Sequence, residues 1–133
     1  MSMAVPWLRS VVAFPLGLVA IHVFHLAGQR LLPLGYGALD SDGARWLALA
    51  LATVAGIVGS FVVGAVAGHR LRLHLAIFFV LMLVIDLGAI RGGLAAQPVW
   101  LKTLVLAVLP LQVWIGGRIT LLAFAEKAPV AGS

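Results

Sequence analysis

The stretch from Trp46 to Gly68 contains no charged residue and consists mainly of alanine, valine, glycine and leucine. A helix of about 20 such residues is long enough to cross the hydrocarbon core of a bilayer, because its backbone hydrogen bonds are all satisfied internally. Arg45 precedes the stretch and His69 follows it. The sequence therefore predicts a membrane-spanning helix from about Ala44 to Gly68.

The rest of the chain has the composition of the same class of protein. Of the 133 residues, 63% are hydrophobic and 10% are charged, and the mean hydropathy is +1.17. A soluble domain of this length could not bury so large a share of apolar side chains. We predict a single integral membrane domain over residues 1–133, with room for about four spanning helices.

Three further apolar stretches complete the predicted fold. Helices are expected at about residues 11–27, 73–90 and 98–118, separated by segments that contain glycine, proline or aspartate. Ser41 or Asp42 is placed to cap the helix at 44–68. The expected architecture is an all-α membrane protein, a four-transmembrane-helix bundle of two hairpins with both termini on the cytoplasmic side.

The basic residues set the predicted orientation. The side that holds both termini carries Arg9, Arg70, Arg72, Arg118 and Lys127, and the other side carries Arg30, Arg45, Arg91 and Lys102. The cytoplasmic side of a membrane protein usually has the excess of such residues. We therefore expect a protein of the bacterial inner membrane with both termini in the cytoplasm. Arg70 and Arg72 are interpreted as topology anchors near anionic head groups, with a specific lipid or protein contact as the alternative. Trp46 and Trp100 are expected to anchor the opposite interface.

Small residues recur every four positions along the predicted helix at 44–68. Side chains at this spacing share a helix face, so they form one stripe, which consists of Ala48, Ala52, Gly56, Ser60, Gly64 and Gly68. Helices in lipid associate through close backbone contact, which small side chains permit. The stripe is predicted to be a packing face, directed either at another helix of the chain or at a second subunit.

Asp86 is the only carboxylate inside a predicted span. An isolated ion at that depth costs a few kcal/mol, so the group should be neutral, paired or in contact with water. At about 1.5 Å per residue, His22 lies at the same height on the first span as Asp86 on the third. The expected partners are His22 and His25, or Arg91 reaching back from the interface. The group is then either a structural pair or a site of proton relay or cation coordination.

His22 and His25 also suggest a cofactor, because a neutral imidazole on an apolar helix is a usual axial ligand of haem and of chlorophyll-type pigments. The chain has no cysteine, which excludes thiolate metal sites, and these histidines with Asp86 are too few for a closed zinc site. The net charge is +5, but the basic residues are scattered along the chain, so we predict no binding of nucleic acid. We predict no metal and no catalytic residues, since no nucleophile and base are paired in the sequence.

Three functions fit these features. The preferred one is a non-enzymatic accessory or assembly subunit that packs into a larger membrane complex through its glycine-rich helix face. Its partners would be membrane lipids and other membrane subunits, or copies of itself. The second is a small oligomeric ion- or proton-coupled transporter or channel that uses Asp86 and His22. The third is a membrane subunit that binds haem or a chlorophyll-type pigment through His22 or His25.

Overall fold

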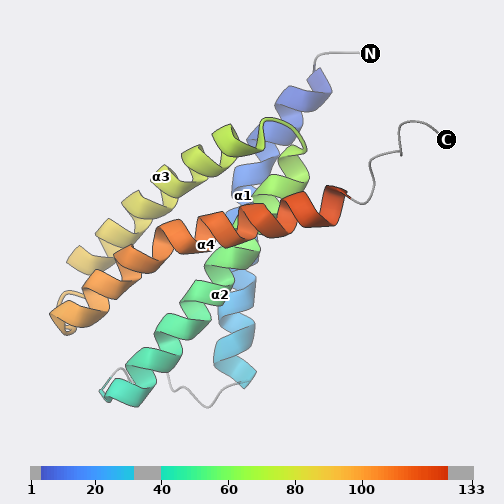
Figure 1. Ribbon diagram of the computed structural model, residues 1–133. Coiled ribbons are helices and arrows are strands. Elements are labelled where there is room, and N and C mark those ends of the chain that lie inside the picture. Colours follow the sequence, from blue (N-terminus) through green and yellow to red (C-terminus); the bar gives the residue numbers. More distant parts are fainter. Residues whose placement is uncertain (1–3, 32–39, 126–133) are drawn as a thin grey trace.

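The computed structural model describes residues 4–31 and 40–125 of the chain. It contains four helices, which are α1 (Ala4–Leu31), α2 (Asp42–Ala67), α3 (Leu71–Arg91) and α4 (Val99–Ala125), and no strand among the described residues (Figure 1). Each helix is long and apolar enough to cross a membrane. The prediction of an all-helical fold with four helices of membrane-spanning length is therefore confirmed.

Two helices are longer than predicted. α1 begins before the expected start near residue 11, and α4 continues past Arg118. In α1, Nε of Arg9 donates to the carbonyl oxygen of Val66 at 2.9 Å, which holds the first turns against α2. In α4, the Arg118 guanidinium lies over the ring of Trp114, 5.8 Å from its centroid. Its charge therefore stays on the surface of a continuous helix.

Local hydrogen bonds fix both ends of α2. Ser41 is extended, and its hydroxyl accepts from the backbone N–H of Ala44 at 3.2 Å, as an N-cap does. At the other end Gly68 has a φ of 67°, which glycine adopts without a steric penalty, and its N–H donates to the carbonyl of Gly64 at 3.1 Å. Arg70 follows with a φ of 46°, so the chain reverses at once and α3 begins beside the end of α2.

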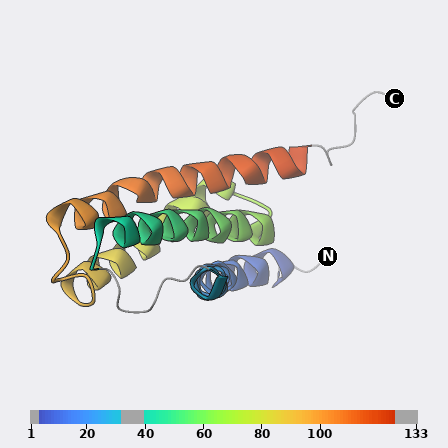
Figure 2. The ribbon, with the colours of Figure 1, turned by 90° about the horizontal axis from the view of Figure 1, so that it is seen from below.

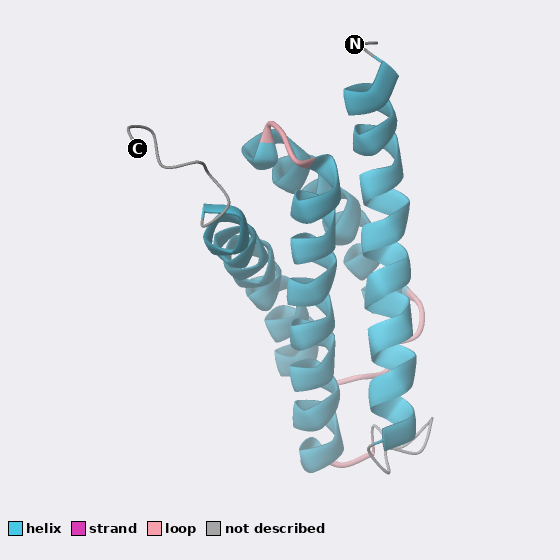
Figure 3. Cartoon of the chain, turned by 90° about the vertical axis from the view of Figure 1, so that its right-hand side faces the viewer, coloured by secondary structure: helices cyan, strands magenta, loops and turns pink. Residues whose placement is uncertain are grey.

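α2 is the centre of the bundle. It packs against all three other helices, and α1 and α4 lie on opposite sides of it (Figure 2 and Figure 3). α2 and α4 run parallel, and small or polar residues pair in register along their contact. The facing pairs are Gly56 with Gln112, Ser60 with Gly116, and Gly64 with Thr120. On its other side α2 meets α1, where Gly17 and Gly59 approach each other closely.

The bundle has two ends, which we name by the connections they hold. The α2–α3 end contains the first turns of α1, the turn between α2 and α3, and the last turns of α4; the α3–α4 end contains the opposite ends of the helices. α1 and α3 meet near the α2–α3 end, where Phe14 stacks on His74 and Gly17 lies against the ring of Phe78. Beyond this point the two helices diverge (Figure 1).

The buried core is small and apolar, and all four helices contribute to it. It consists of Ala13, Val63, Ala67, Phe78, Met82 and Leu109. Many large apolar side chains elsewhere are exposed, among them Val84 at 62% and Leu122 at 71%. Contact between such a surface and lipid acyl chains carries no hydrophobic free-energy cost, whereas exposing it to water does. Together with the four helices of membrane-spanning length, this exposed apolar surface suggests an integral membrane protein.

Candidate functional site

At the α2–α3 end, a serine and two histidines from distant parts of the chain share hydrogen bonds. Ser10 lies on α1, His69 in the turn after α2, and His74 on α3. The Oγ atom of Ser10 is 2.9 Å from Nε2 of His74 and 3.4 Å from Nε2 of His69. The His74 ring is 4% exposed, stacks on Phe14 and meets the His69 ring edge-on at 5.2 Å. We call Ser10, His69 and His74 the Ser–His cluster.

Bonds to the other ring nitrogens determine which atoms of the cluster carry hydrogen. Nδ1 of each histidine faces a backbone carbonyl oxygen, at 3.1 Å for His74 and 2.7 Å for His69. A carbonyl oxygen only accepts, so both Nδ1 atoms are protonated, and in neutral rings both Nε2 atoms face Ser10 as acceptors. The single hydroxyl hydrogen serves one of them, and the carbonyl of Pro6, 3.0 Å away, is a third acceptor. The hydroxyl therefore donates to one of these acceptors at a time, and the cluster links α1 to the turn after α2 and to α3.

This arrangement joins α1 to α3 more readily than it performs catalysis. A serine beside an imidazole has the contact that an activated nucleophile requires. Ser10, however, lies inside α1, where the neighbouring backbone amides are used in helical hydrogen bonds and offer no donors to an oxyanion. The chemistry that the geometry supports is hydrogen bonding between α1, the turn after α2 and α3.

The Arg9 side chain of α1 lies against the C-terminal end of α2. Its Nε atom donates to Val66, and a Cβ atom placed on Gly68 would lie 2.5 Å from one of its Nη atoms. The last carbonyls of a helix lack intrahelical partners and carry partial negative charge, so a guanidinium at this position is stabilising by about 0.3–1 kcal/mol. The glycine at position 68 therefore serves both the backbone turn and the close approach of the arginine.

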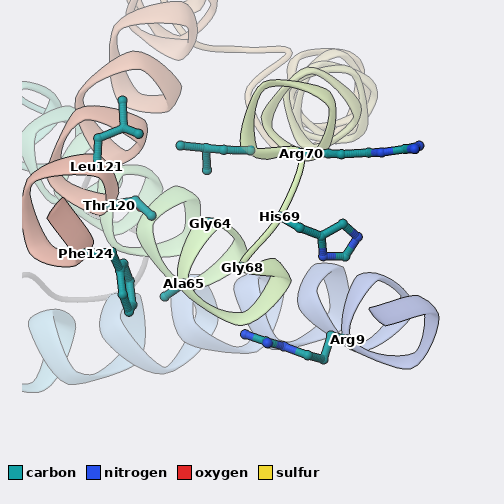
Figure 4. Close-up of a pocket in the computed structure, with 10 residues that line it drawn as sticks. Arg9, Gly64, Ala65, Gly68, His69, Arg70, Thr120, Leu121 and Phe124 are labelled. Carbon is teal, nitrogen blue, oxygen red and sulfur yellow. The ribbon is translucent and has the colours of Figure 1, made fainter. Parts of the chain in front are cut away.

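A pocket of about 540 Å³ lies beside Arg9 at this end of the bundle (Figure 4). Its polar lining consists of Arg9, His69, Arg70 and Thr120, and its larger apolar side chains are Leu71, Leu121 and Phe124. The small residues Gly64, Ala65 and Gly68 supply the α2 side. Basic groups and an apolar wall thus meet in one pocket.

The α2–α3 end is basic throughout its described part. It carries Arg9, Arg70, Arg72 and Arg118 as well as the two histidines. Of the four acidic residues, Asp40, Asp42 and Asp86 lie towards the α3–α4 end, and Glu126 is outside the described residues. Within residues 4–31 and 40–125, one ion pair is formed, between Arg45 and Asp42 at 2.9 Å, and it lies at the α3–α4 end. The arginines of the α2–α3 end have no acidic partner among these residues.

The polar groups predicted to meet inside the membrane are not joined within the chain. Asp86 is half-buried on α3, and among the described residues no hydrogen bond or ion pair links it to His22, His25 or Arg91. The prediction compared the heights of Asp86 and His22 on two helices that run in the same direction, but it did not include the angle between those helices. Because α1 and α3 diverge from the α2–α3 end, equal height does not bring the two groups together (Figure 1).

The two histidines proposed as cofactor ligands differ in their contacts. Nε2 of His25 lies 2.9 Å from Nε2 of Gln29 on the same helix, so His25 would have to give up this bond to ligate a metal through that atom. His22 is exposed and is the freer of the two for axial ligation of haem or a pigment. In the described part of the chain, no group of three histidine, aspartate or glutamate residues is placed to hold a metal ion.

The small-residue stripe of α2 packs mostly inside the chain. Gly56, Ser60 and Gly64 are buried against α4. Towards the α3–α4 end, Ala48 is half-buried and Ala52 is exposed. α4 therefore occupies the central part of the stripe, and the exposed members, Ala52 and Gly68, lie on either side of that contact.

The predicted interfacial residues lie at the two ends of the bundle. Trp46 and Trp100 stack at the α3–α4 end with their centroids 5.0 Å apart, and Nε of Arg45 donates to Oε1 of Gln97 beside them at 3.0 Å. Arg70 and Arg72 are exposed at the α2–α3 end. Arg70 lines the pocket, whereas Arg72 does not.

Sequence reasoning did not identify Ser10, His74 and Arg9 as connecting residues. Arg9 and Ser10 precede the helix start predicted near residue 11, and His74 falls in the first turn of the helix predicted over residues 73–90, where no role was assigned to it. One signal was available, since His74 lies within the first turn of an apolar helix, where a polar side chain needs a partner. That partner is 64 residues away in the chain, and no local pattern identifies it.

Comparisons with known proteins identify no relative, so the function is argued from the geometry of the chain. No protein-family model, curated protein or solved structure matches this chain.

Proposed function

We propose that this chain is a non-enzymatic subunit of a larger membrane assembly and that it meets its partner through α3. The observation that carries the proposal is Asp86, a carboxylate inside a helix of membrane-spanning length with no hydrogen bond or ion pair among the described residues. Such a group inside a membrane is a functional position by default, because retaining it is costly.

The place of Asp86 on α3 supports this proposal. His74, Phe78 and Met82 are buried at four-residue intervals along the helix, and Asp86 is the next position in the same row. His74 and Phe78 are covered by residues of α1. α1 and α3 diverge from the α2–α3 end (Figure 1), and Asp86 is half-buried, so a row that starts as an internal contact ends at a partly exposed residue.

Energetics then favour a partner polypeptide over lipid at this position. Acyl chains cover exposed apolar residues such as Val80 and Val84, but they offer no donor to a carboxyl group. A charged residue costs about 2.5–3.5 kcal/mol at the centre of a spanning helix and less near its ends. A donor or a cation from a second subunit would remove this cost while its apolar side chains pack on α3.

The mode of association differs from the one expected from the sequence. The glycine-rich stripe of α2 was the predicted contact surface, but α4 covers Gly56, Ser60 and Gly64. We therefore assign the association to α3.

We place the subunit in a bacterial inner membrane with its α2–α3 end in the cytoplasm. The arginines gathered at that end favour this orientation, which puts both termini inside. Trp46 and Trp100 then lie at the opposite interface, where amphipathic rings are enriched.

The test uses the full chain extracted from its own membranes in a mild detergent. We expect it to migrate on native gels with defined partner subunits, and Asp86→Asn to abolish this comigration while circular dichroism still reports the helices. Asp40→Asn is the matched control, because it makes the same change at an exposed residue outside the helices. This variant should keep the partners.

Two results would overturn the proposal. Wild-type protein that migrates without partners would exclude an assembly, and Asp86→Asn that retains every partner would exclude α3 as the contact. If the chain instead forms only oligomers of itself, and Asp86→Asn abolishes ion or proton flux in vesicles, the transporter hypothesis replaces this one.

A further inference from the structure

The pocket at the α2–α3 end combines basic groups with an apolar wall. A free anion complements only the basic groups, and a neutral lipid complements only the apolar wall. Arg9, Arg70 and His69 supply its basic groups, and Leu71, Leu121 and Phe124 supply an apolar wall. From this combination we infer that the pocket binds the phosphate group of an anionic phospholipid, with the glycerol and the first acyl carbons against Leu121 and Phe124.

Arg9 is held in a position to bind an anion. Its Nε atom donates to Val66, which fixes the guanidinium, and the N–H groups of both Nη atoms have no acidic partner among the described residues. Figure 4 shows the Arg9 side chain extending from α1 towards Gly68 and Ala65 of the α2 end, both of which line the pocket. A side chain fixed in this way loses little conformational entropy when a phosphate binds.

Arg70 adds a second cation at the edge of the pocket, where Figure 4 shows its side chain extended away from Arg9, and this side chain has no structural role that would hold it there. The residue is exposed, its backbone carbonyl accepts from His74, and its guanidinium forms no hydrogen bond or ion pair in the described chain. Two arginines near one pocket, with no described acid at the same end, make the local charge strongly positive. An anionic ligand is the complement of this charge.

The apolar wall selects a lipid over a free phosphate ion. Leu121 is 53% exposed and Phe124 is 44% exposed, and both lie on the last turns of α4 beside the basic groups. A small inorganic anion gains nothing from apolar side chains beside the basic groups, whereas an amphiphile places its charged head at the arginines and its chain along α4. The pocket volume of about 540 Å³ is sufficient for a phosphoglycerol head group.

The test measures lipids retained by the full chain in native mass spectrometry. The delipidated protein is offered phosphatidylglycerol, phosphatidylcholine, glycerol 3-phosphate or inorganic phosphate at equal concentrations. The variants are Arg9→Gln, Arg9→Lys and Arg70→Gln. Arg72→Gln is the matched control, since it removes the same charge two residues away from Arg70 at an exposed position that does not line the pocket.

We expect the wild-type protein to retain one phosphatidylglycerol in preference to phosphatidylcholine, and neither small phosphate to displace it. Loss of either pocket arginine should weaken retention about fivefold, and the double variant Arg9→Gln with Arg70→Gln about 25-fold. Arg9→Lys should retain the lipid, because it keeps the positive charge even if the bond to Val66 is lost. Arg72→Gln should behave as the wild-type protein.

Arg9→Gln also removes a contact with the end of α2, so the Arg70→Gln result decides the outcome if Arg9→Gln fails to fold. Equal retention of phosphatidylglycerol and phosphatidylcholine would overturn the inference. An effect of Arg72→Gln as large as that of Arg70→Gln would also overturn it, because diffuse surface charge would then explain the preference. Displacement by inorganic phosphate would replace the lipid site with a site for a small anion.

Discussion

The two pairs of parallel helices in this bundle are joined in opposite ways. α2 and α4 approach closely along a row of small residues, where Gly56, Ser60 and Gly64 face α4. α1 and α3 meet at one end, through the bond between Ser10 and His74 and the stack of His74 on Phe14, and then diverge. His22 and Asp86, which form no hydrogen bond or ion pair among the described residues, both lie on the diverging pair.

The difference shows what each kind of contact can achieve in lipid. Small residues give a long contact held by dispersion, because two backbones approach without side chains between them. A polar cluster fixes one point, since its hydrogen bonds are directional and its buried groups need partners. The first kind of contact closes α2 on α4, and the second leaves the rest of α1 and α3 open to lipid or to another subunit.

The largest effect is expected where the diverging pair is joined. His74→Ala removes a buried ring and its hydrogen bond to Ser10, and it should lower the free energy of unfolding by about 3 kcal/mol. The measurement is unfolding in mixed micelles followed by circular dichroism. Ser10→Ala should cost about 1 kcal/mol, since it removes the hydroxyl alone. An unchanged midpoint in His74→Ala would show that α1 and α3 are held together elsewhere.

A smaller loss is expected for the close-packed pair. A Cβ atom on Gly116 would lie 2.8 Å from the carbonyl oxygen of Ile57 and 3.0 Å from the amide nitrogen of Phe61, which are backbone atoms that cannot rotate away. Gly116→Ala should therefore cost about 2 kcal/mol in the same unfolding assay. Gly88→Ala is the matched control, because a Cβ atom there meets nothing within 4 Å. Equal stability of the two variants would contradict the close contact of α2 and α4.

The smallest effect has the opposite sign and concerns the open surface. In the isolated chain, Asp86→Leu should raise the free energy of unfolding by about 1 kcal/mol, because it replaces an unpaired carboxyl group with an apolar side chain. The same unfolding assay measures it, with Asp40→Leu as the exposed control. A loss of stability would show instead that Asp86 has a partner inside the chain.

Parts of this site were predictable and others were not. Cap residues and spans follow local rules, and Ser41 caps α2 as one of the two predicted candidates. The close packing of Gly56 and Gly64 has a visible pattern, but which helix faces them does not. The position of Asp86 was predictable within its span, whereas its lack of a bonded partner depends on the angle between α1 and α3, which spacing along the chain does not encode.

The sequence by itself determined that this chain forms four apolar helices of membrane-spanning length, because hydropathy and backbone hydrogen bonding in lipid leave no other structure for such stretches. It also determined that the α2–α3 turn is basic and that the middle of α2 is small. The tertiary structure alone decided that α4 covers the small residues, that Ser10 meets His74, and that Arg9 and Arg70 line one pocket. These contacts join residues far apart in the chain, and they depend on helix direction and crossing, which are set by packing between helices.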